Sequence, residues 1–311
     1  NDRVRGIFEI APLTDVFTMK PSVRDALGGC PRDMASDAAT ARSLPTILLD
    51  RWIAFWASVF ALVGALWWLG NDTASWMWRA FVRRQVRIGA SGITAQIVRV
   101  GVRSISIVML VSGSIGIILA LQTSPTLEEY GQTDKVANLI GVAVFRELGP
   151  LVAAIVMVGF AGASIAAELG TMVVGEEVEA LEAMGLNPVR YLVVPRLAAT
   201  VASLLALAVI SNLTAVFFGM VVGVTALGIP YDLYVSNTLN QLSMSDFLTG
   251  LLKAGVFGLL LGLVACYNGL KVTGGAAGVG RATTETVVQT VIFVVLSDLF
   301  FSTIFYAIGW N

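Results

Sequence analysis

Five stretches of this chain run for about 20 residues with few or no charged side chains. They cover residues 104–122, 148–167, 197–231, 247–270 and 286–310, and only the last two contain a charge, at Lys253 and Asp298. A helix needs about 20 apolar residues to cross the hydrocarbon core of a bilayer. We therefore predict an all-α polytopic membrane protein with five transmembrane helices.

The composition agrees with this prediction and argues against several other classes. Of the 311 residues 56% are hydrophobic and 13% are charged, whereas soluble domains carry about 25% charged residues. The 20 Lys and Arg residues are balanced by 21 Asp and Glu residues, so no basic surface for nucleic acid is expected. The chain has no His, and Cys30 and Cys266 are far apart. We therefore expect no metal site, no disulfide and no catalytic residue.

The distribution of basic residues predicts the orientation, because cytoplasmic loops are enriched in Lys and Arg. The segment 226–246 has none and segment 123–135 is mostly acidic, which places both outside. The basic residues before the first span and after the second and fourth then lie inside, with the N-terminus in and the C-terminus out. Residues 52–71 would lie in the interface or dip into one leaflet. The alternative is a sixth span at 52–71 with an outside N-terminus.

Three segments are predicted along the chain. Residues 1–50 form a polar N-terminal segment, residues 51–103 form interfacial amphipathic helices, and residues 104–311 form the five-span domain. The interfacial prediction rests on an apolar face opposite a basic one, as in helices that lie in the headgroup plane. The apolar face holds Trp78, Phe81, Val82 and Ile88, and the basic face holds Arg79, Arg83, Arg84 and Arg87. The third apolar stretch is longer than a span needs, and we expect it to end or bend at Gly219, Gly223, Gly228 and Pro230.

The segment 175–186 is predicted to be a short amphipathic helix in a cytoplasmic loop. Val178, Leu181 and Met184 recur at helical spacing, and Gly185 is a typical helix stop. Four glutamates share the segment, at Glu176, Glu177, Glu179 and Glu182. An anionic leaflet would repel them, so a protein partner is favoured for the apolar stripe. The alternative is a solvated acidic loop.

Charged side chains at membrane depth indicate function by default, because their burial is costly. Those in or beside the spans are Arg146, Glu147, Glu168, Lys253 and Asp298. Arg146 and Glu147 are adjacent and cannot face each other on a helix, so each needs another partner. Lys253 is a candidate partner for Asp298. Such a pair is either structural or part of a proton relay.

The glycine-rich segment 275–282 matches part of the sequence pattern of a phosphate-binding loop. Arg281 stands where that pattern has Lys, and Ala282 stands where it has Ser or Thr. We interpret it as a flexible cytoplasmic turn that binds no nucleotide. ATP hydrolysis would then require another chain.

Several motifs, taken in order, make the chain resemble the MlaE/YrbE permease family over about residues 52–310. They are RELGP at 146–150, AELGTM at 167–172, EALEAMG at 179–185, NP at 187–188, LVVPR at 192–196, YNG at 267–269 and GVGRATT at 278–284. The family supplies the membrane subunits of ABC lipid transporters that work with MCE proteins. Residues 1–28 resemble the end of a STAS domain, which some members carry.

The resemblance implies a homodimer with a separate ABC ATPase that binds ATP and Mg, an MCE partner on the outer side and a phospholipid-like substrate. A STAS-domain protein is a further candidate partner. Five spans are too few for a path within one protomer, which favours the same dimer. The membrane would be the bacterial inner membrane, or the chloroplast inner envelope if the source is a plant. The expected ATPase-coupling residues are Glu176, Glu177, Val178, Glu179, Leu181, Glu182, Met184 and Gly185.

The lipid path is expected at the outer end of the first span, where the candidate lining residues are Leu119, Gln122, Leu127 and Tyr130. Ordinary packing is the alternative role for each of them. Two other functions remain open at this point. One is a proton-coupled secondary carrier that uses Asp298 and Lys253, and the other is a membrane scaffold that transports nothing.

Overall fold

The computed structural model describes residues 44–81 and 90–309. All regular structure in these residues is helical, without a β-strand. Five helical stretches are long and apolar enough to cross a membrane: Gly92–Glu129, Thr133–Val174, Val189–Thr225, Met244–Leu270 and Gly275–Ile308. The prediction of an all-α polytopic protein with five such helices is confirmed.

The first described helix, α2, spans Leu44–Phe81 in 38 residues. The predicted interfacial segment 52–71 lies within this single helix, which also continues through Trp78. Whether it crosses the membrane or lies in the interface stays a prediction. Residues 82–89 lie outside the described part of the chain, so only Arg79 of the expected basic face is described, and it is exposed in the last turn of α2. The STAS-like segment 1–28 lies outside it as well.

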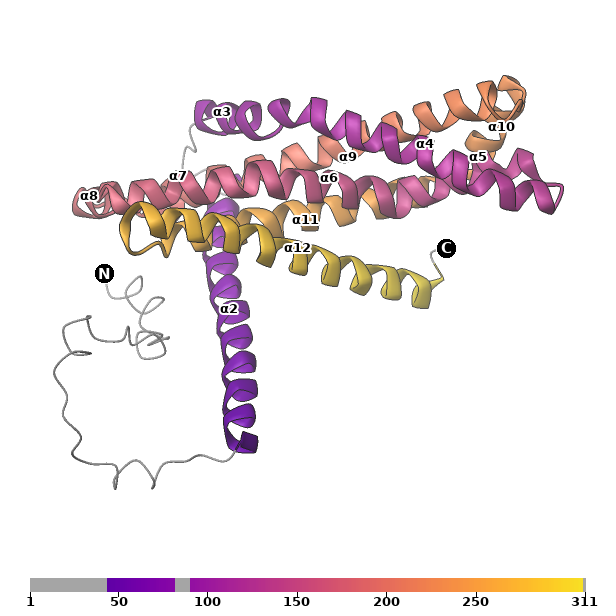
Figure 1. Ribbon diagram of the computed structural model, residues 1–311. Coiled ribbons are helices and arrows are strands. Elements are labelled where there is room, and N and C mark those ends of the chain that lie inside the picture. The colour runs from indigo at the N-terminus through magenta and orange to yellow at the C-terminus, as the bar shows by residue number, and fades with distance from the viewer. Residues whose placement is uncertain (1–43, 82–89, 310–311) are drawn as a thin grey trace. The chain divides into compact units, whose positions relative to one another are not determined.

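The remaining helices form an elongated bundle (Figure 1). The first span consists of α3, a 3₁₀ turn η4 and α4, and the second consists of η5, α5, η6, α6, η7 and α7. Their bounds are Ala90–Val100, Val102–Ser104 and Ile105–Glu129 for the first, and Thr133–Lys135, Val136–Ala143, Val144–Leu148, Gly149–Met157, Val158–Gly162 and Ala163–Val174 for the second. After them follow α8 (Glu177–Ala183), η8 (Val189–Val193), α9 (Val194–Thr225), α10 (Tyr231–Gln241), α11 (Met244–Leu270) and α12 (Gly275–Ile308).

Figure 1 also defines the two ends of the bundle that are used below. The α8 end holds α8 and the turn between α11 and α12. The α10 end holds α5, α10 and the C-terminus of α4.

Two of the π-helical turns in the spans have a proline as their cause. The turn η6 ends one residue before Gly149-Pro150, and η8 is followed by Val194-Pro195. Proline has no N–H to donate and its ring clashes with the carbonyl four residues earlier. A wider turn relieves that clash and lets the helix continue. The third π turn, η7, has no proline near it.

Helix α9 lies at the centre of the bundle and packs against α4, α11, α6 and α3. Glycines permit the closest approaches. A β-carbon on Gly116 of α4 would lie 2.0 Å from the carbonyl oxygen of Ala215 in α9. A β-carbon on Gly258 of α11 would lie 2.9 Å from the α-carbon of Val201. Small residues therefore set the helix spacing at these crossings, as is usual in membranes.

The third span ends within the stretch 219–230 where its end was predicted. Helix α9 stops at Thr225, and Gly219 and Gly223 lie inside it without ending or bending it into a loop. Gly223 instead makes room for Tyr234, whose ring would lie 2.6 Å from a β-carbon there. The stop comes at Gly228, where φ is +66°, and at Pro230, which caps α10.

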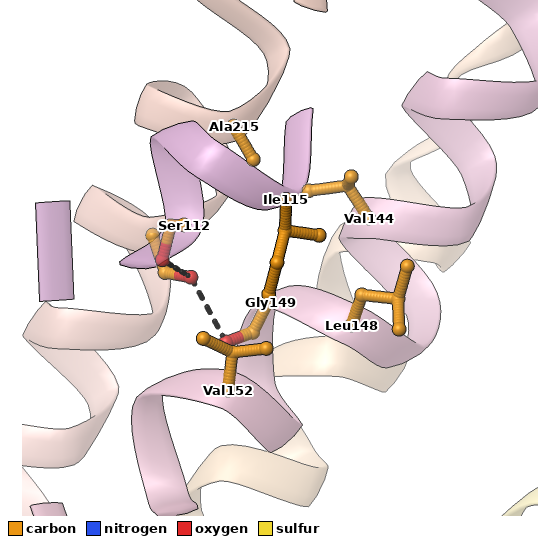
Figure 2. A pocket seen from close by; sticks show the side chains of 8 residues that line it. Ser112, Ile115, Val144, Leu148, Gly149, Val152 and Ala215 are labelled. Carbon is orange, nitrogen blue, oxygen red and sulfur yellow. Dashed lines mark hydrogen bonds between the residues drawn. The ribbon is translucent and has the colours of Figure 1, made fainter. Parts of the chain in front are cut away.

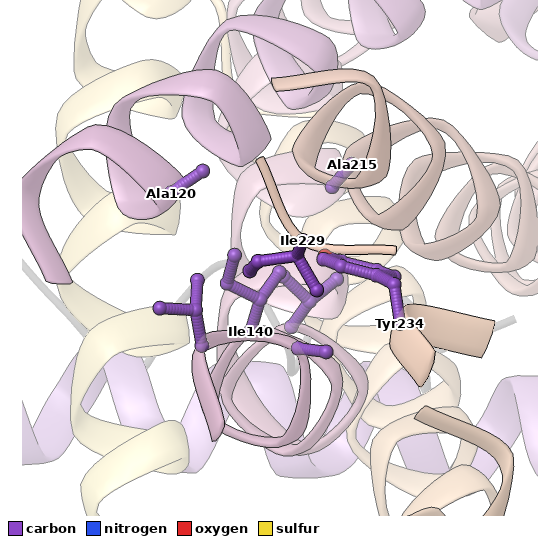
Figure 3. Packing of buried hydrophobic residues seen from close by; sticks show 8 residues of the cluster. Ala120, Ile140, Ala215, Ile229 and Tyr234 are labelled. Carbon is purple, nitrogen blue, oxygen red and sulfur yellow. The ribbon is translucent and has the colours of Figure 1, made fainter. Parts of the chain in front are cut away.

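The expected loop 226–246 contains α10, which closes the α10 end of the bundle. Tyr234 of α10 packs with Ile140 of α5, Ala120 of α4, and Ala215 and Ile229 (Figure 3). This helix was not predicted, because about half of its residues are polar. Its buried face is limited to a few positions, chiefly Tyr234 and Thr238.

The glycine-rich segment 275–282 is helical, so its prediction as a flexible turn is wrong. Helix α12 begins at Gly275 and not at 286. The turn is confined to Lys271–Gly274, and both Gly274 (φ +85°) and Gly275 (φ +67°) adopt the left-handed backbone that favours glycine. Residues 276–282 then continue as helix, and α12 packs against α11 and α7.

Candidate functional site

The predicted helix at 175–186 is present as α8, and its C-terminus is closed by a complete Schellman motif. The N–H of Gly185 donates to the carbonyl of Glu182 (2.9 Å), and the N–H of Leu186 donates to that of Leu181 (3.0 Å). Gly185 has φ +76°, the left-handed conformation that this motif requires. Asn187 then accepts from the N–H of Val189 (2.9 Å) and starts η8. The loop between α7 and α9 is thus a well-defined hairpin.

The four glutamates of this hairpin are exposed, and its apolar stripe is only partly covered. Val178 and Leu181 are half-buried, while Met184 is 67% exposed and Leu186 is 42% exposed. A charged helix with an uncovered apolar edge has the character of a contact surface. Figure 1 shows α8 projecting at one end of the bundle, where another protein has access to it.

The entry into α8 is strained. Glu176 has φ +57°, and it is the one non-glycine residue with positive φ among those described. A left-handed backbone costs an L-residue about 1–2 kcal/mol. Gly175, directly before it, does not take up this conformation.

A second feature of the α8 end is an ion-pair cluster around Glu168 of α7. One carboxylate oxygen lies 3.0 Å from Nη2 of Arg196 in α9, and the other lies 2.7 Å from Nη1 of Arg99 in α3. Arg196 is almost fully buried and also donates to the carbonyl of Leu192 (3.0 Å). Glu168 was predicted to lie in or beside the second span, but its partners were not predicted.

A third feature is a cluster around Lys253, which joins the second, fourth and fifth spans. Its ammonium donates to Glu147 (2.6 Å) and Ser302 (2.8 Å), and it lies 2.9 Å from Oδ1 of Asp298. Lys253 is nine residues into α11, which is roughly 14 Å along the helix axis. The structure therefore brings together Lys253 and Asp298, as the sequence suggested, and adds Glu147 as a second carboxylate.

The other half of the adjacent pair, Arg146, bonds to Asp246 at the start of α11. Asp246 also closes a capping box, because its other oxygen accepts from the N–H and the hydroxyl of Ser243, both at 2.9 Å. The pattern Ser243-x-x-Asp246 was a signal in the sequence for this cap. Nothing in the sequence pointed to Arg146, which lies 100 residues away.

The candidate lipid-path residues divide into two pairs. Leu119 and Leu127 pack against the buried cluster of Figure 3, which is the alternative role considered for them. Gln122 and Tyr130 are exposed, Tyr130 by 73%.

Residues between α4, α9 and the second span surround a small hollow (Figure 2). It is lined by Ser112, Ile115, Val144, Leu148, Gly149, Val152, Ser211 and Ala215. Ser112 and Ser211 are bonded at 2.7 Å, and Ser211 donates to the carbonyl of Gly149 at 3.0 Å. The hollow has no room for a water molecule, so it cannot hold a lipid tail. Within residues 44–81 and 90–309, no group of three or more Cys, Asp and Glu side chains is arranged for a metal ion.

Comparison with known proteins identifies the family. The family model described as Permease MlaE matches residues 93–304. A probable ABC transporter permease protein of Rickettsia felis is 35% identical over 216 residues, which cover 70% of this chain and 83% of the relative. Proteins of the same description from Synechocystis sp. and Pyropia yezoensis are 32% and 30% identical and cover 70% and 75% of this chain, and 83% and 89% of the relatives. The match runs through all five spans, the α8 hairpin and both ion-pair clusters, and the chain therefore belongs to the MlaE permease family.

Proposed function

We propose that this chain is the membrane-embedded permease subunit of an ABC transporter for phospholipid-like molecules, with ATP hydrolysis on a separate chain. The observation that carries the proposal is α8, a well-defined helix with exposed glutamates and an exposed Met184 on the loop between two spans. The names of the relatives support the transporter class.

The α8 hairpin is the proposed docking site for the ATPase. Glu176, Glu177, Glu179 and Glu182 offer charge to a basic surface, while Val178, Leu181 and Met184 offer an apolar stripe. Gly185 holds the turn that returns the chain to η8. This role requires the α8 end of the bundle to be cytoplasmic, which the positive-inside rule favours.

The lipid path is proposed to lie between two copies of this chain, with an MCE protein on the outer side. The small hollow inside the described bundle supports this, because it has no room for a lipid tail. Gln122 and Tyr130, exposed at the α10 end of α4, are the remaining lining candidates.

Native mass spectrometry of the complex, extracted from its own membranes in mild detergent, tests the proposal. We expect two copies of this chain, two ATPase subunits, an MCE oligomer and bound lipid. A particle with no ATPase would contradict the ABC transporter function. A particle with no lipid would favour a scaffold.

The docking role is tested with the double variant Glu179→Lys/Glu182→Lys. Reversing two exposed charges should lower the recovery of the ATPase at least about tenfold, which corresponds to 1.4 kcal/mol of binding free energy. The matched control is Glu128→Lys/Glu129→Lys, two exposed glutamates at the α10 end, which should leave recovery unchanged. Normal recovery with the first variant would contradict the docking site.

A second candidate function is a proton-coupled carrier, and the Lys253 cluster is the observation that favours it. Charged groups at membrane depth are typical of proton pathways. A carrier would move lipid without ATP and would stop when an uncoupler collapses the proton gradient. The ABC function predicts the reverse for both measurements in reconstituted vesicles.

A further inference from the structure

A single carboxylate at the α8 end ties three helices together. We propose that Glu168, with Arg196 and Arg99, is the clamp that passes the movement of α8 to the first span. This rests on the proposed function, since it assumes that an ATPase moves α8. Glu168 and the two arginines are thus positioning residues for transport, remote from the lipid itself.

The clamp first joins the two stems of the α8 hairpin. Glu168 lies on α7, which leads into α8, and Arg196 lies on α9, which follows η8. Their side chains are 3.0 Å apart. Arg196 is 5% exposed and also bonds to Leu192 in η8, so it has little freedom to find another partner. A push on α8 therefore reaches α7 and α9 as one unit.

The second oxygen of Glu168 extends the clamp to α3. Arg99 reaches it from the end of α3 at 2.7 Å. Two residues after Arg99, the chain packs tightly on α9 at the turn that follows α3, where a β-carbon on Gly101 would lie 2.7 Å from Oγ of Ser203. The helical stretch Gly92–Glu129 continues from α3 into α4. Movement received at Arg99 is thus carried along the first span toward Gln122 and Tyr130.

Helices α11 and α12 also pack against α7 at this end, but they do so without an ion pair to this cluster. Lys271, Arg281 and Glu285 lie on or beside α11 and α12, and none of them makes an ion pair within residues 44–81 and 90–309. Within the described residues, the ion pairs of the α8 end therefore join α7 to α9 and α3, and none of them reaches α11 or α12. This asymmetry is what a directed transmission requires, whereas general stabilisation of the end would spread ion pairs over all five spans.

The test is the ratio of lipid transferred to ATP hydrolysed by the complete complex. The complex is reconstituted in vesicles of phosphatidylethanolamine and phosphatidylglycerol, and transfer is followed with fluorescent phosphatidylethanolamine. In Glu168→Gln the ATPase should co-purify normally and hydrolyse ATP at the wild-type rate, while the ratio falls at least about fivefold, a coupling change of about 1 kcal/mol. The matched control is Glu285→Gln, the same change at an exposed glutamate of the same end, which should leave the ratio unchanged.

Arg99→Gln keeps the Glu168–Arg196 bond and removes only the contact to α3, on a side chain that is 48% exposed. It tests the clamp even if Glu168→Gln fails to fold. The ratio should fall here too, and Arg99→Gln/Glu168→Gln should be no worse than Glu168→Gln alone, because both changes break one path. A wild-type ratio in Arg99→Gln overturns the clamp but leaves the ABC function intact. A wild-type complex without an ATPase overturns both.

Discussion

The two ion-pair clusters of this protein have opposite compositions. At the α8 end one carboxylate, Glu168, lies between two arginines. Nearer the α10 end one ammonium, Lys253, lies between two carboxylates. In each cluster one central group faces two groups of the opposite charge, and one of those two is much more exposed than the other. Arg99 is 48% exposed and Glu147 is 40% exposed.

The two clusters differ in whether the remaining charged side chains can reach solvent when the central residue, Glu168 or Lys253, is substituted. Glu168 is 25% exposed and lies six residues before the end of α7. Arg99 is 48% exposed, so it can extend its long side chain toward the membrane surface. Lys253 is 1% exposed and lies well inside α11. Asp298 has a short side chain, of which 17% is exposed. The Lys253 cluster should therefore be needed chiefly for stability, while the Glu168 cluster tolerates change and can serve movement.

The largest expected effect is that of Lys253→Met. It leaves Glu147 and Asp298 without their cation, and removing one partner of a buried ion pair typically costs about 3–5 kcal/mol. Thermal unfolding in detergent should show a clear drop in stability. The double variant Lys253→Met/Asp298→Asn should recover part of the loss, because it removes one of the two uncompensated carboxylates.

The matched measurement at the other cluster is Glu168→Gln, in the same detergent. Its loss of stability should be the smaller of the two. Arg99 is half in solvent, and the amide oxygen of a glutamine can still accept a hydrogen bond from the buried Arg196. If Glu168→Gln destabilises the protein as much as Lys253→Met does, the proposed division between a stability cluster and a movable cluster is wrong.

Much of the fold was predictable from the sequence because apolar runs of this length have few alternatives in water. The fourth span, predicted at 247–270, differs from α11 by only three residues at its start. Helix starts and stops were less predictable where glycines were involved. Gly223 looks like a stop, yet it accommodates Tyr234 across a helix contact, and this role depends on a segment outside the span.

The candidate sites were predictable only where their partners are close in sequence. The α8 helix follows from the spacing of Val178 and Leu181 and from Gly185. The partners of Glu168 and Arg146 lie 28 and 100 residues away in the chain, and no local pattern encodes them. Lys253 and Asp298 were paired in advance because they are the charged residues within the last two apolar runs.

A smaller effect is expected from Tyr234, a buried titratable group of the α10 end that has no charged partner. Its hydroxyl makes no hydrogen bond within the described part of the chain, and burial raises the pKa of Tyr234 to about 12 from 10.0. The folded state thus keeps the proton longer than the unfolded state. The contribution of protonated Tyr234 to the stability of the folded state is complete below pH 10 and is lost as the pH rises through about 12.

Stability measured against pH distinguishes Tyr234→Phe from the wild type. Two pKa units correspond to about 2.7 kcal/mol, so the wild type should lose up to this amount between pH 10 and 12 relative to the variant. At neutral pH Tyr234→Phe should be as stable as the wild type or more so, because it removes an unpaired buried hydroxyl. Parallel curves for the two proteins above pH 10 would show that Tyr234 is accessible to water.

The smallest effect is expected at Glu176, where the α8 end is strained. Glu176→Gly relieves a left-handed backbone that costs about 1–2 kcal/mol, but glycine also loses more entropy on folding. The net gain should be about 0.5–1 kcal/mol. The matched control is Glu177→Gly, one residue later in the first turn of α8, which should lose about 0.5–1 kcal/mol, since glycine disfavours helix.

The same pair of variants separates strain from function. If the strain at Glu176 only reflects the tight turn, Glu176→Gly should be more stable and should transport lipid as efficiently per ATP as Glu177→Gly, which also removes one proposed docking glutamate. If the strain holds α8 at the angle that the ATPase engages, Glu176→Gly should be more stable but less well coupled than Glu177→Gly. The second result would place the mechanical link between ATPase and membrane at one backbone angle, and would extend the movable cluster of the α8 end from Glu168 to Glu176.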